Sequence, residues 1–113
     1  MKHEHRRDLF PGALEMMILQ TLRRRPLHGY AIVQHLKHTS DELLQIEEGS
    51  LYPALQRMLK AGWVQAEWGV SARNRRVRTY KLLPAGRKQL EHQVSSFERM
   101  LEGIMRVMRL AHS

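Results

Sequence analysis

The apolar residues near the start of the chain recur at the spacing of a helix. In residues 11–24 they stand at Leu14, Met17, Ile18 and Leu22. Spacings of three and four residues place such side chains on one face of an α-helix. Pro11 suits the first turn of this helix, and Pro26 cannot continue it. The pattern therefore predicts a first helix over residues 11–24.

Two more helices are predicted before residue 63. One runs from about 28 to 38, with one of two apolar sets facing inward: Tyr30, Val33 and Leu36, or Ile32 and Leu36. A turn at 39–41 and a short helical turn at 41–44 follow. The other helix opens at Ser50 as its N-cap and has an apolar stripe at Leu51, Leu55, Met58 and Leu59. Gly62 is expected to end it in the left-handed conformation.

From Trp63 onward the apolar pattern changes to that of strands. An aromatic and β-branched run covers residues 63–68, a polar loop covers 69–76, and apolar and cationic residues alternate over 77–82. A period of two is typical of a strand with one buried face. These segments predict a β-hairpin with a long basic tip. Both Trp63 and Trp68 are expected to belong to the core.

The last predicted helix begins at Pro84–Gly86 and has the most regular apolar pattern in the chain. Its apolar residues alternate at spacings of four and three: Leu90, Val94, Phe97, Leu101, Ile104 and Met108. This alternation is the seam of helices that pack along their length. About 25 residues of helix span nearly 40 Å, more than the width of the remaining core. We therefore expect one end to overhang and to pair with a second copy of the chain. The alternative is that the stripe folds back on its own domain.

Three helices, a basic hairpin and a final helix, in that order, form the plan of a winged helix-turn-helix domain. In that plan the third helix enters the major groove of DNA, and the hairpin, called the wing, touches the flanking backbone. We therefore expect a mainly α fold with a β-hairpin wing and a long C-terminal dimerisation helix. Residues 1–83 are the expected DNA-binding domain and residues 84–113 the dimerisation helix, in one compact unit.

The charge of the chain points to a polyanionic partner. There are 19 Lys and Arg against 11 Asp and Glu, a net charge of +8. Five of these cations and no acid lie between Gly69 and Lys81, whereas residues 11–48 hold four cations and five acids. A basic segment of this kind displaces counterions from a phosphate backbone. The alternative is a solvated basic surface.

Other classes of protein and site find little support in the sequence. The absence of Cys excludes disulfides, a thiol nucleophile and thiolate metal sites. His35 and His38 share a helix face, but two imidazoles fall short of the usual metal site, so we expect no metal and no cofactor. No catalytic motif is present, so we expect no enzyme. Residues 1–7 lead into no apolar run and no segment is long enough to span a membrane, which favours a cytoplasmic location.

Three segments resemble one known family. Residues 27–32 (LHGYAI) look like the "HGY" segment of the PadR-like repressors, and residues 49–58 (GSLYPALQRM) look like their "GtLYpaLxRL" recognition-helix signature. Residues 80–87 (YKLLPAGR) are similar to the "YxLTxxGr" signature, although Pro84 stands where the family usually has a Thr cap. The resemblance covers about residues 10–110. The single C-terminal helix resembles the small subfamily, and a winged-helix DNA-binding fold is what the resemblance implies.

The third helix supplies four candidate DNA-binding residues. Ser50 and Tyr52 lie at its start, where a hydroxyl and free backbone N–H groups meet a phosphate, and the resemblance implies that this tyrosine contacts DNA. The alternative is a core tyrosine with a bonded hydroxyl. Gln56 and Arg57 lie farther along, and such side chains pair with adenine and guanine in the major groove. Either is equally typical of a solvated surface.

The wing supplies four more candidates. Arg73, Asn74, Arg75 and Arg76 are donor-rich residues at the hairpin tip, suited to phosphate or minor-groove contact. A solvated loop is the alternative. His28 and Tyr30 are expected to be structural, because in the resembling family the "HGY" segment positions the second helix against the third.

These features together predict a homodimeric repressor that binds a pseudo-palindromic operator in double-stranded DNA. A different class remains open, namely a winged-helix module that binds protein or RNA without reading DNA sequence. A third hypothesis adds a small hydrophobic effector, since members of the family bind flat compounds at the dimer interface. Phe97, Met100 and Met105 are the residues that would line such a space, although helix packing explains them more economically.

Overall fold

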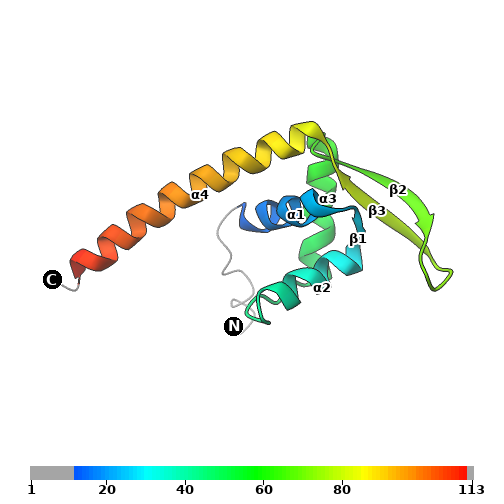
Figure 1. Ribbon diagram of the computed structural model, residues 1–113, viewed down its shortest axis with the longest axis horizontal. Helices are drawn as coiled ribbons and strands as arrows, with labels where there is room; N and C mark the ends of the chain where they lie inside the picture. The colour runs from blue at the N-terminus through cyan, green and yellow to red at the C-terminus, as the bar shows by residue number, and fades with distance from the viewer. Residues whose placement is uncertain (1–11, 112–113) are drawn as a thin grey trace.

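The structure, a computed structural model, describes residues 12–111 (Figure 1). In this part of the chain the elements are α1 (Ala13–Arg24), β1 (Leu27–His28), α2 (Gly29–Thr39), α3 (Glu48–Ala61), β2 (Val64–Val70), β3 (Arg76–Leu82) and α4 (Pro84–Ala111). The sheet is antiparallel in the order β1-β3-β2. The expected fold class, a winged helix-turn-helix with a long C-terminal helix, is confirmed. Pro11 and residues 1–7 lie outside the described residues.

The core lies between the first three helices and the base of the wing. Its fully buried side chains include Ile18, Leu19, Ile32, Leu51, Leu55, Met58 and Val64. Of the two inward faces considered for α2, the pair Ile32 and Leu36 is the buried one. Tyr30, which belongs to the other of the two alternative sets, is 57% exposed and does not face inward. It lies two residues from Ile32, and on a helix that spacing turns a side chain to the opposite side.

The start of α2 is fixed in two ways that periodicity did not reveal. The Nδ1 atom of His28 accepts a hydrogen bond from the backbone N–H of Ala31 at 3.3 Å, so His28 caps the helix. The backbone of Leu27 and His28 forms β1, which pairs with Tyr80 and Thr79 of β3. A strand of two residues is too short to leave an alternating pattern in the sequence.

The loop before α3 differs from the prediction. Asp41 and Glu42 have left-handed backbone angles (φ 56° and 66°), so the expected helical turn at 41–44 does not form. The helix α3 begins at Glu48 with Glu47 as its N-cap residue, which places Ser50 inside the first turn and not at the cap. At the other end, Gly62 adopts φ 79° as expected, and its N–H donates to the Leu59 carbonyl at 3.1 Å.

The wing is a longer ribbon with a shorter tip than predicted, because the strands extend to Val70 and Arg76. The side chain of Ser71 closes the tip by accepting the backbone N–H groups of Arg73 (3.3 Å) and Arg75 (3.2 Å). Trp68 is 60% exposed, so its expected place in the core is wrong. Trp63 is partly buried and packs against the core.

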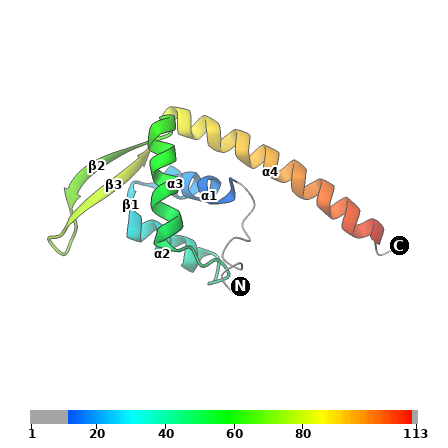
Figure 2. The same cartoon turned by 180° about the vertical axis from the view of Figure 1, so that it is seen from behind.

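The long helix α4 leaves the core at the end opposite the wing (Figures 1 and 2). A Cβ atom on Gly86 would overlap the carbonyl oxygen of Trp63, so the first turn needs a residue without a side chain. Leu90 is 3% exposed and belongs to the core of its own chain, which corrects its expected place in the dimer seam. Val94 packs on the same core, whereas residues 101–109 are all exposed.

Candidate nucleic-acid interface

An open groove of about 1000 Å³ runs between the start of α2, the helix α3 and the wing. It is lined by His28, Gly29, Tyr30, Tyr52, Trp68, Ser71, Ala72, Arg73, Arg75, Arg76, Val77, Arg78 and Tyr80. Four of these residues are arginines and none is acidic. A concave surface lined by one sign of charge concentrates its field on a ligand of the opposite sign. The groove is therefore suited to a polyanion.

Tyr52 is the α3 residue that lines the groove. It is 41% exposed, which argues against the alternative of a core tyrosine. Burial is the main cause that raises the pKa of the Tyr52 phenol above its usual value of 10.0, with smaller effects of Glu48 and Tyr80. At neutral pH the hydroxyl is therefore protonated and able to donate a hydrogen bond to a phosphate oxygen.

The other candidates on α3 lie away from this groove. Ser50 and Gln56 are exposed but are not among the lining residues. Arg57 donates from Nη2 at 2.6 Å and from Nε at 3.0 Å to Glu15 of α1, so its guanidinium is already paired within the chain. Five residues separate Arg57 from Tyr52, which turns the two side chains to different sides of the helix.

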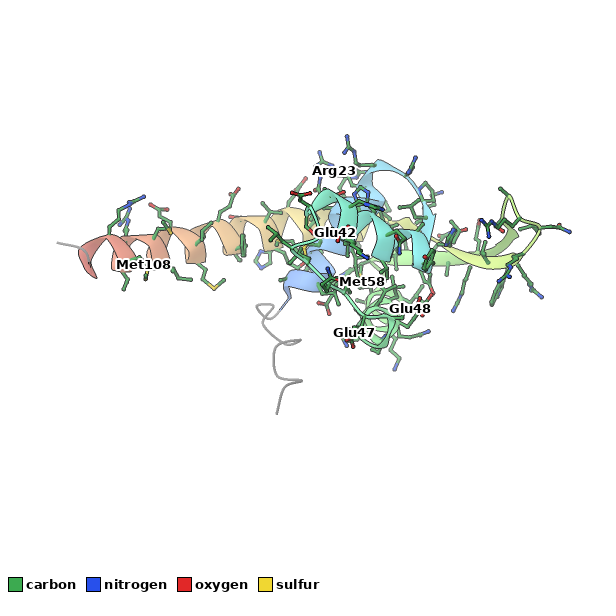
Figure 3. The ribbon with its side chains drawn as sticks, turned by 90° about the horizontal axis from the view of Figure 1, so that it is seen from below. Arg23, Glu42, Glu47, Glu48, Met58 and Met108 are labelled. Atoms are coloured by element: carbon green, nitrogen blue, oxygen red, sulfur yellow. The ribbon has the colours of Figure 1, made fainter. Side chains whose placement is uncertain are left out.

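Two acidic residues occupy the start of α3. Glu47 and Glu48 are both exposed there, as Figure 3 shows, with Arg23 on the opposite side of the domain. Carboxylates at this position stabilise a helix through its dipole, but they repel a phosphate at the same place. The expected phosphate contact of Ser50 therefore has an unfavourable electrostatic setting.

The wing brings three of its four candidates into the groove. Arg73, Arg75 and Arg76 line it, while Asn74 is exposed at the turn with φ 62°. The left-handed angle suits asparagine better than most other residues, which gives Asn74 a role in shaping the tip.

Trp68 and Arg78 are among the groove residues that were not predicted as part of the site. The guanidinium of Arg76 lies over the Trp68 ring at 4.7 Å, and that of Arg78 lies 5.9 Å from the same ring. Arg76, Arg78 and Tyr80 alternate along β3. Their shared face of the strand is the signal by which Arg78 could be found from sequence, given the wing candidate Arg76.

Other kinds of site find no counterpart in the described residues. Within residues 12–111, no three His, Cys, Asp or Glu side chains come together as a metal site would require. Among the helices of this part of the chain, none combines the length and apolar character needed to cross a membrane.

Comparisons with known proteins agree with this architecture. The sequence model of the "Transcriptional regulator PadR-like family" matches residues 18–92. A transcriptional regulator from Clostridium thermocellum is 27% identical, with 85% of this chain and 93% of that chain covered and a TM-score of 0.79. A PadR family transcriptional regulator from Eggerthella lenta is 28% identical, with 96% and 88% covered and a TM-score of 0.75.

A further likeness concerns the fold alone. Bacillus subtilis PadR in complex with operator DNA is 22% identical, with 73% of this chain and 46% of that chain covered and a TM-score of 0.65. The family match, over residues 18–92, includes every residue that lines the groove. The chain belongs to the PadR-like family of transcriptional regulators.

Proposed function

We propose that the protein is a homodimeric repressor that binds a pseudo-palindromic operator in duplex DNA. The observation that carries the proposal is the groove in which Tyr52 of α3 and the wing arginines face one space. Cationic side chains of this kind neutralise phosphates and release counterions, which supplies much of the affinity for DNA. The related fold of Bacillus subtilis PadR in complex with operator DNA supports the same use of the fold.

We propose that the two chains of the dimer pack through the C-terminal half of α4. The helix has 28 residues, which corresponds to about 42 Å. Among the described side chains of this helix, the large exposed apolar residues are Met100, Leu101, Ile104, Met105, Val107 and Met108. At 100° per residue they cover an arc of about 160°, which is wide enough for a helix that packs against other helices. Exposed apolar area of this kind favours a partner, and a second copy of the chain presents the matching face.

The seam of this proposed dimer is shorter than the one expected from the sequence. Leu90 is buried in the core of its own chain and is unavailable for the seam, and the partly buried Val94 packs against the same core. Phe97 lies at the boundary and is partly buried. The proposed interface therefore consists of Phe97, Leu101, Ile104 and Met108 together with their exposed neighbours.

A hydrophobic effector is a second proposal for the same region. Phe97 and Met100 help to line a hollow of about 340 Å³ between α1 and α4, beside the buried Oε1 atom of Gln93, which has no hydrogen-bond partner among the described residues. Met105 lies two turns beyond Phe97 and outside the hollow. A flat compound with a hydrogen-bond donor suits this lining. Isothermal titration with a series of planar phenols tests this proposal. If none of the compounds gives a heat of binding, the result counts against it.

The experiment that tests DNA binding compares two duplexes at two salt concentrations. The purified protein is titrated with the promoter DNA upstream of its own gene and with a scrambled duplex of equal length. Tight binding to the promoter alone supports the operator-binding repressor. Equal, salt-sensitive binding to both duplexes would favour the alternative, a basic winged-helix module that does not read DNA sequence. Sedimentation of the same sample tests the dimer.

A further inference from the structure

The inner face of the wing carries a ladder of rings and guanidinium groups. From the tip toward the core it consists of Arg76, Trp68, Arg78 and Tyr80. The guanidinium of Arg76 lies 4.7 Å from the centroid of the Trp68 ring, and that of Arg78 lies 5.9 Å from the Trp68 and Tyr80 rings alike. At such distances a cation is attracted to the face of an aromatic ring. The indole thus lies between two positive groups.

The ladder is anchored at one end only. Tyr80 is 3% exposed, and its backbone pairs with Leu27 of β1 and with Ala66 of β2. Trp68, directly opposite Arg78, is 60% exposed. An indole that is mostly in solvent gains little from burial, so its benefit has to come from its neighbours or from a partner. All four members of the ladder line the groove.

We propose that Trp68 is a positioning residue for DNA binding, because its indole holds the guanidinium groups of Arg76 and Arg78 where they meet the phosphate backbone. This inference rests on the proposed function. Neither arginine forms an ion pair with another described residue, so the charge of both is available to an anion. A free arginine side chain loses rotamer freedom when it binds. An arginine already held on a ring loses less, and the affinity rises by that difference.

The test is a double-mutant cycle on the promoter duplex upstream of the protein's own gene. The change Trp68→Leu keeps an apolar side chain but removes the aromatic face, and it should weaken binding about five- to tenfold. The change Trp68→Phe keeps a ring and should retain most of the affinity. Unchanged affinity of Trp68→Leu would overturn the proposal.

The same Trp68→Leu change in two other backgrounds shows whether Trp68 positions the arginines or contacts DNA directly. In the Arg76→Ala/Arg78→Ala background, Trp68→Leu should cause no further loss, because the groups that it positions are gone. In the Lys81→Ala background its effect should persist, since Lys81 is an exposed cation of β3 outside the groove. Equal losses in all backgrounds would mean that Trp68 touches DNA itself, and the proposal would be wrong.

The free protein gives a reading that does not depend on DNA. In the NMR spectrum, the side-chain protons of Arg76 should be shifted upfield by the Trp68 ring relative to those of Arg73 and Arg75 at the tip. The shift should vanish in Trp68→Leu, and thermal unfolding of that variant checks that the fold persists. If the wild type shows no such shift, Arg76 does not stack on the Trp68 ring in solution and the proposal is wrong. A wild type that shows the shift but binds no duplex would refute the proposed function and, with it, the role of Trp68 in DNA binding.

Discussion

A Cβ atom on Gly29 would lie 2.5 Å from the hydroxyl oxygen of Tyr52. Gly29 is the first residue of α2, and Tyr52 lies in the second turn of α3. The ring of Tyr52 therefore packs directly on the backbone of Gly29, and the same Cβ would also meet its Cε1 and Cζ atoms at 2.9 Å. Two sequence motifs that are far apart along the chain thus meet at one contact, which sets the distance between α2 and α3 and places the phenol in the groove.

The change Gly29→Ala should disturb this contact. The added methyl group overlaps the Tyr52 ring, and overpacking of this kind costs about 1–3 kcal/mol of unfolding free energy. We expect a lower thermal midpoint, measured by circular dichroism, and weaker DNA binding because the phenol is displaced from the groove.

A matched control is Gly49→Ala, because nothing lies within 4 Å of a Cβ atom at that position of α3. Its stability should be unchanged or raised, since alanine favours a helix over glycine. Adding Tyr52→Ala to Gly29→Ala should cost less than Tyr52→Ala costs in the wild type. Full additivity of the two changes would show that the residues do not touch.

Periodicity predicted which side of each helix or strand is apolar. It predicted less well how far along that side the protein core extends. Trp68 does lie on the same face of β2 as Val64, which is buried, but the core ends before Trp68 is reached. The expected seam of α4 shows the converse. Leu90 and Leu101 belong to one continuous stripe, yet the first is buried within the chain and the second is exposed. A periodic apolar pattern therefore indicates that one side of a helix packs against something. It does not indicate whether that is the core of the same chain or another molecule.

The binding site, too, was predicted only in part, because local patterns are visible in the sequence and contacts between distant residues are not. The wing arginines were found because a run of cations without acids is visible in one dimension. The pairing of Arg57 with Glu15 was not, because 42 residues separate them and no local rule connects them. Likewise the approach of Gly29 to Tyr52 depends on how two helices pack. Contacts between distant segments are therefore what the sequence alone left undetermined.

The change Tyr52→Phe should weaken DNA binding about tenfold without loss of stability at neutral pH, if the hydroxyl donates to a phosphate. Because the pKa of Tyr52 is raised, the folded protein holds the phenolic proton more tightly than the unfolded chain does. The stability from this group is therefore complete below the usual pKa of 10.0 and is lost as the pH rises through the folded-state value.

Binding measured at pH 7 and pH 9 checks this prediction, because the phenol stays protonated at both. The ratio of wild-type to Tyr52→Phe affinity should be the same at the two values. A ratio that falls toward one at pH 9 would mean that the pKa is lowered and not raised. Equal affinities of the two proteins at pH 7 would remove the hydroxyl from the interface.

Replacing Arg73, Arg75 and Arg76 with Ala should weaken binding to all DNA sequences alike. Each phosphate that an arginine no longer neutralises should lower the slope of log affinity against log salt by about 0.9. Fluorescence anisotropy over a series of salt concentrations measures the slope.

The control for total charge removes three arginines elsewhere. Arg23, Arg24 and Arg25 are exposed and do not line the groove, and Arg23 lies on the side of the domain opposite the start of α3 (Figure 3). Changing these three residues to Ala lowers the net charge by the same amount. The slope of log affinity against log salt should nevertheless stay close to that of the wild type. Equal slopes for the two triple variants would show that overall charge, and not the wing, governs binding.

The double change Leu101→Glu/Ile104→Glu should produce monomers. Both side chains are exposed in the single chain, so the new carboxylates do not disturb its core. In the proposed dimer they would be buried in an apolar seam, where an unpaired charge is strongly unfavourable. Sedimentation velocity should show the loss of the dimer, and operator affinity should fall because two half-sites no longer bind together.

The matched control is Arg99→Glu/Arg106→Glu, which places two carboxylates on the opposite side of the same helix. At 100° per residue, these positions lie about 180° from the centre of the apolar arc. The control variant should remain dimeric, although Arg106 gives up its 2.7 Å ion pair with Glu102, because exposed pairs of this kind contribute little. If both variants are monomeric, the added charge and not the apolar face explains dissociation. If the Leu101→Glu/Ile104→Glu variant still sediments as a dimer, the two chains associate through another surface.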